Sequence, residues 1–262
     1  MPASLSPGVC FPMPSLYAPS KTSPDRPGLL LSFDDAGNIP YWHRAMHIFR
    51  RYNAHVTFFI DRFDTLTSES VEMLRDLRAA GHAIGCHSLR HLSATFYVQD
   101  HGVERYLMTD IEPAIAAMHA RGFATHSFAY PNSKHDEQTD AALSRYFGRL
   151  RSGAKNTTVV PLVKLDDLYA PLDQVAGRRN MLGAGIDSIT NRNLDVLRPC
   201  FARAAERSEV MTLYAHRIDA DGPPTSRLGI SHSQLSAVLE AVREAGLSFY
   251  TFDDLPACPL TC

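Results

Sequence analysis

The sequence has few cysteines and no strong excess of charge of either sign. Its five cysteines, at positions 10, 86, 200, 258 and 262, are widely scattered and form no CxxC pair, which argues against a disulfide framework and favours free thiols. Lys and Arg number 26 against 28 Asp and Glu, so the formal net charge is -2. Because this balance offers nothing to attract a polyanion, we expect no nucleic-acid partner.

Long apolar segments are also missing. No run of 18 apolar residues occurs, so we expect no transmembrane segment. Residues 1–27 are rich in Pro and Ser but have neither a cationic start nor an apolar core of signal-peptide length. We therefore predict an irregular N-terminal arm over 1–27. As written, the sequence favours a cytoplasmic protein, or an extracytoplasmic one if a signal has been removed.

After this arm, short apolar runs alternate with longer amphipathic stretches. LLLSF (29–33) and HVTFFI (55–60) have the length of buried strands, whereas residues 68–81 and 234–246 space their apolar residues as helices do. Strand–helix alternation of this kind predicts a parallel sheet, and the number of residues over which it continues suits a closed or partly open barrel. The sequence contains no internal repeat and no linker that would divide the core, so residues 28–262 are predicted to form one α/β domain.

Two adjacent aspartates, Asp34 and Asp35, follow the first predicted strand. Neighbouring carboxylates repel each other, so the pair needs full solvation or a cation. In parallel α/β folds the C-terminal ends of strands carry the functional residues, and other strand ends supply His87, His91 and His216. His87 and His91 are four residues apart, so on a helical turn both would face one ion. Two histidines and one carboxylate form the ligand set of a catalytic divalent metal such as zinc.

Each of these features alone has a simpler explanation. An Asp-Asp pair is usually a solvated turn or a helix cap, and HxxxH can arise by chance among 12 histidines. A single histidine at a strand end most often satisfies a hydrogen bond. The hypothesis of a metal site therefore rests on the joint placement of all these residues at successive strand ends.

In this order, the residues resemble the motifs of the polysaccharide deacetylase family (carbohydrate esterase family 4, the chitooligosaccharide deacetylase homology domain). The resemblance covers roughly 29–255. SFDDAG (32–37) resembles the family's T-F-D-D-G with Ala36 inserted, HSLRH (87–91) matches H-[ST]-x-x-H, and LYAH (213–216) resembles the last motif. The resemblance implies a distorted, incompletely closed (β/α) barrel of about seven strands.

The same resemblance implies a role for each motif residue. Asp34 would be the catalytic base and His216 the catalytic acid. Asp35, His87 and His91 would bind a divalent metal, with Zn2+ expected and Co2+ or Ni2+ as alternatives.

The third family motif, R-x-P-Y, is altered in this chain. In FAYPNS (128–133), Ala129 stands where the family has the arginine that holds its catalytic aspartate, and Asn132 stands where it has tyrosine. Some branches, similar to the exopolysaccharide poly-N-acetylglucosamine deacetylases, also read F-A-Y-P. By resemblance the backbone N–H of Asn132 would stabilise an oxyanion, and Asp187 would support His216. The source of the arginine's function is left open.

The resemblance implies metal-dependent amide hydrolysis that removes an acyl group, acetyl in the first place, from an N-acylated sugar or polysaccharide. Phe96, Tyr97 and Tyr130 are candidates for contacting the sugar, while Trp42 is expected to pack in the outer layer of the barrel. Two alternatives stay open: a deformylase or small-amide hydrolase on the same scaffold, and a non-catalytic carbohydrate-binding relative. The sequence does not indicate the oligomeric state.

Overall fold

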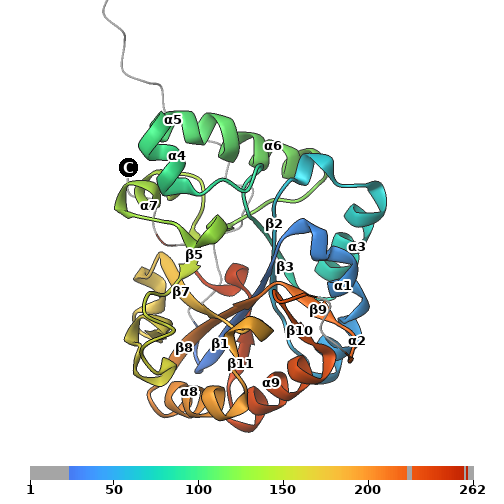
Figure 1. Ribbon diagram of the computed structural model, residues 1–262, viewed down its shortest axis with the longest axis vertical. Coiled ribbons are helices and arrows are strands. Elements are labelled where there is room, and N and C mark those ends of the chain that lie inside the picture. Colours follow the sequence, from blue (N-terminus) through green and yellow to red (C-terminus); the bar gives the residue numbers. More distant parts are fainter. Residues whose placement is uncertain (1–23, 223–225, 257, 259–262) are drawn as a thin grey trace, which may run out of the picture.

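Parallel strands and surrounding helices make up the part of the chain that the computed structural model describes, residues 24–222, 226–256 and 258 (Figure 1). Residues 1–23 of the predicted arm lie outside it. The strands are β1 (Gly28–Asp34), β2 (Thr57–Ile60), β3 (Ala83–Cys86), β4 (Ser127–Ala129), β5 (Arg149–Gly153), β6 (Tyr169–Pro171), β7 (Asn180–Gly185), β8 (Glu209–Ala215), β9 (Arg217–Asp219), β10 (Gly229–Ser231) and β11 (Ser248–Tyr250). The helices are α1 (Ile39–Arg44), α2 (Met46–Tyr52), α3 (Ser68–Ala79), α4 (Ala94–His101), α5 (Val103–Tyr106), α6 (Glu112–Ala120), α7 (Glu137–Leu143), α8 (Leu194–Glu206) and α9 (His232–Glu244).

Seven of the strands form a barrel. Strands β1, β2, β3, β4, β5, β7 and β8 are hydrogen-bonded in that order, and β8 pairs in parallel with β1 along 28–33. The parallel barrel of about seven strands is thus confirmed, but the β1–β8 pairing closes the ring that the resemblance left open. The shortest pairing between neighbouring barrel strands is that of β3 with β4, in which Cys86 lies opposite Phe128. Two further strands, β11 and β6, extend the sheet.

Strand β1 is buried along its whole length, as expected for a parallel strand covered on both faces. Its side chains alternate between two apolar clusters because successive residues of a strand point to opposite faces. Leu29 and Leu31 belong to the large cluster that includes the helices, whereas Leu30 packs in a small cluster with Phe59 and Ala129. The small cluster gathers residues from several strands and fills the barrel's interior.

Two helical regions have details that matter for the site or for capping. Residues 103–120 form α5, a π-helix (Leu107–Ile111) and α6 in succession, and Pro113 lies in the first turn of α6, where proline is tolerated. Helix α3 begins at Ser68 and is capped by the Thr67 side chain, which accepts a hydrogen bond from the N–H of Ser70.

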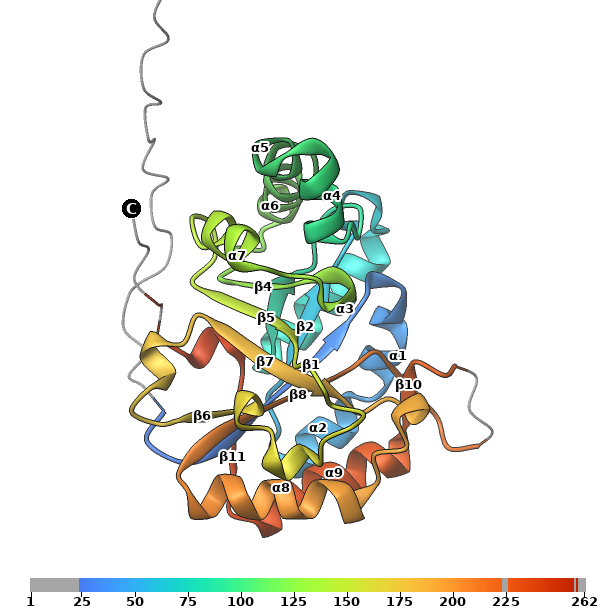
Figure 2. The ribbon, with the colours of Figure 1, turned by 60° about the vertical axis from the view of Figure 1, so that its left-hand side comes forward.

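The helices also frame the barrel unevenly. Helices α4, α5 and α6 stand together at one end of the molecule, while α8 and α9 lie side by side at the other (Figure 2). None of the helices in the described residues is long and apolar enough to cross a membrane.

Candidate active site and metal centre

Asp35, His87 and His91 come together at one rim of the barrel. Asp35 follows β1, and the two histidines follow β3. The Oδ1 atom of Asp35 lies 3.7 Å from Nε2 of His87 and 3.3 Å from Nε2 of His91. Among the described residues these three offer ligand atoms that all lie within 4.8 Å of one another. One oxygen and two imidazole nitrogens at this spacing fit a divalent metal such as zinc.

The spacing of the two histidines suggested that a helical turn brings them together, but this is not the case. Residues 87–91 form a bend, with Ser88 at φ 69° and His91 at φ 57°. Both values lie in the left-handed region that residues other than glycine adopt infrequently. The HxxxH spacing was therefore a sound indicator of the pair, but the backbone that brings the imidazoles together is a loop.

Hydrogen bonds and burial fix the state of these ligands. The Nδ1 atom of His87 lies 2.7 Å from the carbonyl oxygen of Ala129, so Nδ1 carries the proton and Nε2 keeps its lone pair. Burial lowers the pKa of His87. Burial would raise the pKa of Asp35, but a hydrogen bond from His91 and the nearby histidine charges outweigh it and lower that pKa to about 2. The site thus presents a carboxylate and a neutral buried imidazole.

The neighbouring Asp34 has one engaged and one free oxygen. The residue is 2% exposed and forms an ion pair through Oδ2 with the guanidinium of Arg151. Its Oδ1 atom is buried and has no hydrogen-bond partner among the residues described. A carboxylate held at one oxygen and free at the other is arranged to accept a proton.

Arg151 comes from a strand that the sequence motifs did not point to. It lies on β5, directly opposite Ala129 of β4 in the register of the sheet. Its guanidinium lies between two aromatic rings, 5.4 Å from the centroid of Phe59 and 4.7 Å from that of Tyr214. The arginine missing from position 129 is therefore replaced by one on the adjacent strand, reaching the same aspartate.

His216 and Asp187 form a second hydrogen-bonded pair. Asp187 accepts from the backbone N–H of His216 at 3.0 Å, and its other oxygen lies 2.8 Å from Nδ1 of that histidine. Burial opposes protonation of His216, but the hydrogen bond to Asp187 and the charge of Asp34 outweigh it and raise its pKa to about 9. His216 is therefore a protonated imidazole at neutral pH, the state that a general acid requires.

Trp42 is tied to the same histidine through the backbone. Its indole Nε1 donates a 2.7 Å hydrogen bond to the carbonyl oxygen of His216. The ring is fully buried and stacks on Phe58 with centroids 4.9 Å apart. Trp42 thus packs in the core, as expected, and also anchors the strand end that carries His216.

The three residues predicted to contact a sugar lie in different environments. Phe96, on α4, is 57% exposed, and Nζ of Lys134 lies 5.5 Å from its ring centroid. Tyr97 is partly buried against the core. Tyr130 is fully buried and donates its hydroxyl to Asp140 at 2.6 Å, so it is a core residue whose ring does not face solvent. Phe96 is the one of the three that is open to a ligand.

Asn132 lies on the short 3₁₀ helix Pro131–Ser133 with φ 55°. Its side chain is exposed and donates to Oγ of Ser93 at 3.0 Å, which ties this turn to the start of α4. The N–H groups in the first turn of a helix lack an acceptor within it, and the backbone N–H of Asn132 lies in such a turn.

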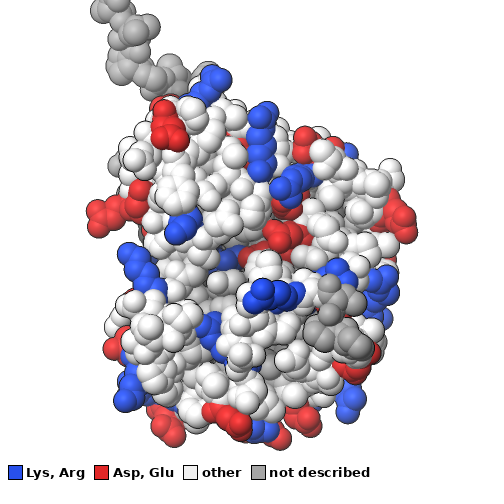
Figure 3. Space-filling model, in the orientation of Figure 1, with Lys and Arg blue, Asp and Glu red and all other residues white. Residues whose placement is uncertain are grey.

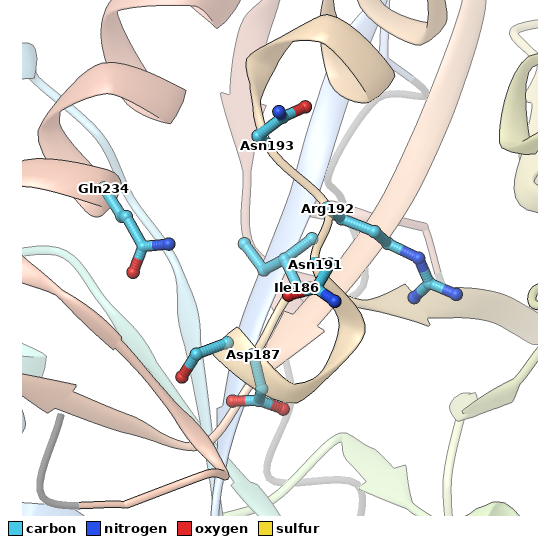
Figure 4. Close-up of a pocket in the computed structure, with 7 residues that line it drawn as sticks. Ile186, Asp187, Asn191, Arg192, Asn193 and Gln234 are labelled. Carbon is cyan, nitrogen blue, oxygen red and sulfur yellow. The ribbon is translucent and has the colours of Figure 1, made fainter.

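A pocket of about 330 Å3 lies beside Asp187 rather than at the Asp35–His87–His91 group. Figure 4 shows its walls. It is lined by Ile186, Asp187, Ser188, Asn191, Arg192, Asn193 and Gln234. Much of this polar lining is already engaged: Asn193 caps α8, Gln234 completes the cap of α9, and Arg192 donates to the carbonyl oxygens of Gly185 and Thr157. Asp187 lines this pocket, whereas Asp34, His216 and the Asp35–His87–His91 group are not part of its wall.

Acidic atoms are visible near the centre of the face shown in Figure 3, with basic side chains at separate points around them. The face carries no continuous patch of one sign. This mixed surface agrees with the small formal net charge of the whole sequence.

Comparisons with known proteins bear on the family and the fold. Residues 21–148 match the family model for polysaccharide deacetylases, whereas a search of curated proteins found no match. A family 4 carbohydrate esterase from Streptomyces lividans, solved with acetate, is 11% identical, with a TM-score of 0.57 over 90% of this chain and 98% of its own. A peptidoglycan deacetylase from Bacillus subtilis is 14% identical, with a TM-score of 0.56 over 88% and 91%.

An acetyl xylan esterase from Clostridium thermocellum, solved with a cobalt ion, is 16% identical, with a TM-score of 0.54 over 86% of this chain and 88% of its own. At these identities the likeness is one of fold. The barrel, its Asp–His–His group and the family match together define a deacetylase-type hydrolase of amide bonds. The chain belongs to the polysaccharide deacetylase family.

Proposed function

We propose that the protein removes an acetyl group from an N-acetylated sugar within a polysaccharide or oligosaccharide. The observation that carries this proposal is Asp34, whose Oδ1 is buried and unpartnered in the described residues while Arg151 holds Oδ2. Its neighbour Asp35 joins His87 and His91. A free base next to a set of metal ligands is the arrangement that hydrolysis of an amide by water requires.

The metal centre would be formed by Asp35, His87 and His91. Their one-oxygen, two-nitrogen donor set and close spacing fit Zn2+, with Co2+ or Ni2+ as alternatives. When bound, a divalent cation acts as a Lewis acid that makes water more acidic and polarises an acyl carbonyl. The relative solved with a cobalt ion supports a divalent metal in this family.

The base and the acid are separate groups with different partners. Asp34 accepts the proton of the attacking water at Oδ1, and the ion pair with Arg151 keeps the carboxylate oriented. His216, protonated at neutral pH because Asp187 stabilises its charge, gives a proton from Nε2 to the leaving amine. An amine leaves poorly unless it is protonated, so the reaction needs this acid in addition to the base.

The backbone N–H of Asn132 is the proposed donor to the oxyanion of the tetrahedral intermediate. Loss of one such donor typically costs about 2.7–4 kcal/mol of transition-state stabilisation. Because this donor is a backbone group, the left-handed conformation of Asn132 matters more than the chemistry of its side chain.

The substrate class is supported by the relatives and by the rim of the site. Solved relatives carry the names peptidoglycan deacetylase and acetyl xylan esterase, so acetylated sugars are the common theme. Phe96 offers an exposed aromatic ring near the turn of Asn132, to which α4 is tied through Ser93. Aromatic faces stack on the apolar face of a sugar ring, and we assign Phe96 this role.

The test is acetate release from N-acetylglucosamine oligomers, with N-formyl and O-acetyl sugars assayed beside them. Wild type should release acetate from the N-acetyl substrates, and both Asp34→Asn and His216→Ala should lose most of this activity. Asp100→Asn, at an exposed position on α4, is the matched control and should keep it. Full activity in either active-site variant would refute the assignment, and binding without turnover by wild type would indicate a non-catalytic carbohydrate-binding protein.

A further inference from the structure

The loop His87–His91 holds two metal-ligand candidates in an unusual backbone conformation. Ser88 and His91 both have positive φ, at 69° and 57°, although neither is glycine. Conformations of this kind persist when the surrounding structure enforces them. The relative position of the two imidazoles therefore depends on whatever holds residues 88–91 in place.

Three groups hold this loop: the Ser88 hydroxyl accepts from the N–H of His91 at 2.9 Å, the carbonyl of Leu89 accepts from the N–H of Arg62 at 3.1 Å, and Asp110 makes the remaining contacts. Its Oδ1 accepts hydrogen bonds from the backbone N–H groups of Leu89, at 3.0 Å, and Arg90, at 2.6 Å. The N–H of Leu89 also donates to the backbone carbonyl of Asp110 at 3.2 Å. Asp110 is fully buried, so water does not compete for these bonds. Hydrogen bonds from N–H groups to a buried carboxylate are stronger than those between neutral groups.

A π-helix presents this carboxylate. Asp110 lies within Leu107–Ile111, between α5 and α6, and its neighbours Leu107 and Ile111 are buried in the core. A π-helix holds more residues per turn than an α-helix, is rare, and is frequently found at functional sites. The apolar neighbours fix the turn, and the wide turn directs Asp110 toward the loop.

We propose that Asp110 is a positioning residue for the metal centre. Its carboxylate fixes the backbone N–H groups of Leu89 and Arg90, which lie between His87 and His91 in the sequence. It thereby sets the distance between the two Nε2 atoms that would bind the metal. This inference rests on the proposed function insofar as it requires metal binding at Asp35, His87 and His91. It adds that a residue touching none of the ligand atoms controls the affinity of the site.

The test is the affinity of the metal-free, folded protein for Zn2+, measured by competition with a chelator. Asp110→Ala removes the acceptor of both loop N–H groups, and we expect the affinity to fall about 10- to 100-fold, as for other residues that orient metal ligands. Asp110→Asn should keep most of the affinity, because its amide oxygen can accept the same two bonds. The absorption spectrum of bound Co2+ should change in Asp110→Ala, since it reports coordination geometry.

Ile111→Val is the matched structural control, because it removes one buried methyl group from the same π-helix without touching the loop. It should lower the melting temperature and leave Zn2+ affinity unchanged. Wild-type affinity and Co2+ spectrum in folded Asp110→Ala would overturn the inference while leaving the proposed function intact. If Asp110→Ala does not fold, Asp110→Glu, which displaces the carboxylate by one methylene, is expected to weaken binding in its place. A wild type that binds no Zn2+ would overturn both proposals.

Discussion

Arg151 reaches across from strand β5 to form a buried ion pair with Asp34 of strand β1, from the position directly opposite Ala129. The small side chain at 129 leaves room in the barrel for a guanidinium that enters from the adjacent strand. The pair leaves the second oxygen of Asp34 without a partner among the described residues. The barrel thus keeps an arginine–aspartate contact while the sequence position of the arginine has changed.

Replacing Arg151 with methionine should damage both stability and catalysis. Breaking a buried ion pair by removing one partner leaves the other charge uncompensated, which costs about 3–5 kcal/mol. A base that is no longer oriented should also lower kcat, by about 100-fold. Urea unfolding and acetate release measure the two effects. In the double variant Asp34→Asn/Arg151→Met no carboxylate is left unpaired, so part of the lost stability should return. If the stability losses of Asp34→Asn and Arg151→Met simply add in the double variant, the pairing is contradicted.

The imidazole of His216 should titrate near pH 9 in the metal-free protein. Its pKa is raised to about 9 from 6.5 mainly through Asp187, against the effect of burial. Because the folded-state pKa is the higher one, this pair stabilises the fold fully below about pH 6.5, and the contribution is lost as the pH rises toward 9. NMR titration measures the pKa directly. In Asp187→Asn it should fall toward 6.5, and an unchanged value would contradict the role given to Asp187.

His82 should make the fold less stable in moderate acid. It is buried between the rings of Phe49 and Phe58, and its Nδ1 accepts a hydrogen bond from the N–H of Val56 at 3.2 Å. Burial, with the charges of neighbouring groups, lowers its pKa from 6.5 to about 4. The unfolded chain therefore binds the proton more readily, and stability should fall by about 3 kcal/mol as the pH drops from 6.5 to 4.

Denaturant unfolding at a series of pH values measures this contribution. His82→Asn can still accept the hydrogen bond from Val56 but does not titrate, so its stability should depend less steeply on pH in that window. His47→Asn, at an exposed position, is the control and should keep the slope of the wild type. Identical slopes for His82→Asn and wild type would show that other groups cause the loss.

Metal content should depend on the two histidines of the loop. Elemental analysis after incubation with Zn2+ should find about one ion per chain in wild type, as for a single three-ligand site, and almost none in His87→Ala/His91→Ala. Exchange of His101 and His119, which lie outside the site, for alanine gives a control with the same loss of two histidines. Retention of the ion in the first variant would place the metal elsewhere.

The site was predictable from sequence where its residues follow strands directly. Asp34, Asp35, His87 and His216 end or follow buried apolar runs, so the rule that parallel strands carry function at their C-terminal ends groups them. Arg151 was not predictable in this way, because its contact with Asp34 depends on the register between β4 and β5. The sequence did hold one signal, an arginine in a strand buried on both faces, since a charge in such a position requires a partner.

The fold was predictable to a similar degree. Long amphipathic segments such as 68–81 and 234–246 gave helices close to their expected bounds. Strands β6 and β7 were not predicted from the sequence, because β6 has only three residues and ends at a proline, and β7 contains two glycines. The sequence left open whether the barrel closes, because closure depends on pairing between β1 and β8, which are far apart in the sequence.

Trp42 gives the protein a built-in optical probe. It is the only tryptophan in the sequence, and its indole N–H is bonded to the carbonyl of His216. Its fluorescence therefore comes from a single indole that is hydrogen-bonded to the backbone of His216, the proposed catalytic acid, and we expect the emission to depend on whether that hydrogen bond is intact. Metal uptake, substrate binding and opening of the strand end can each be followed as a change in emission from the unlabelled protein.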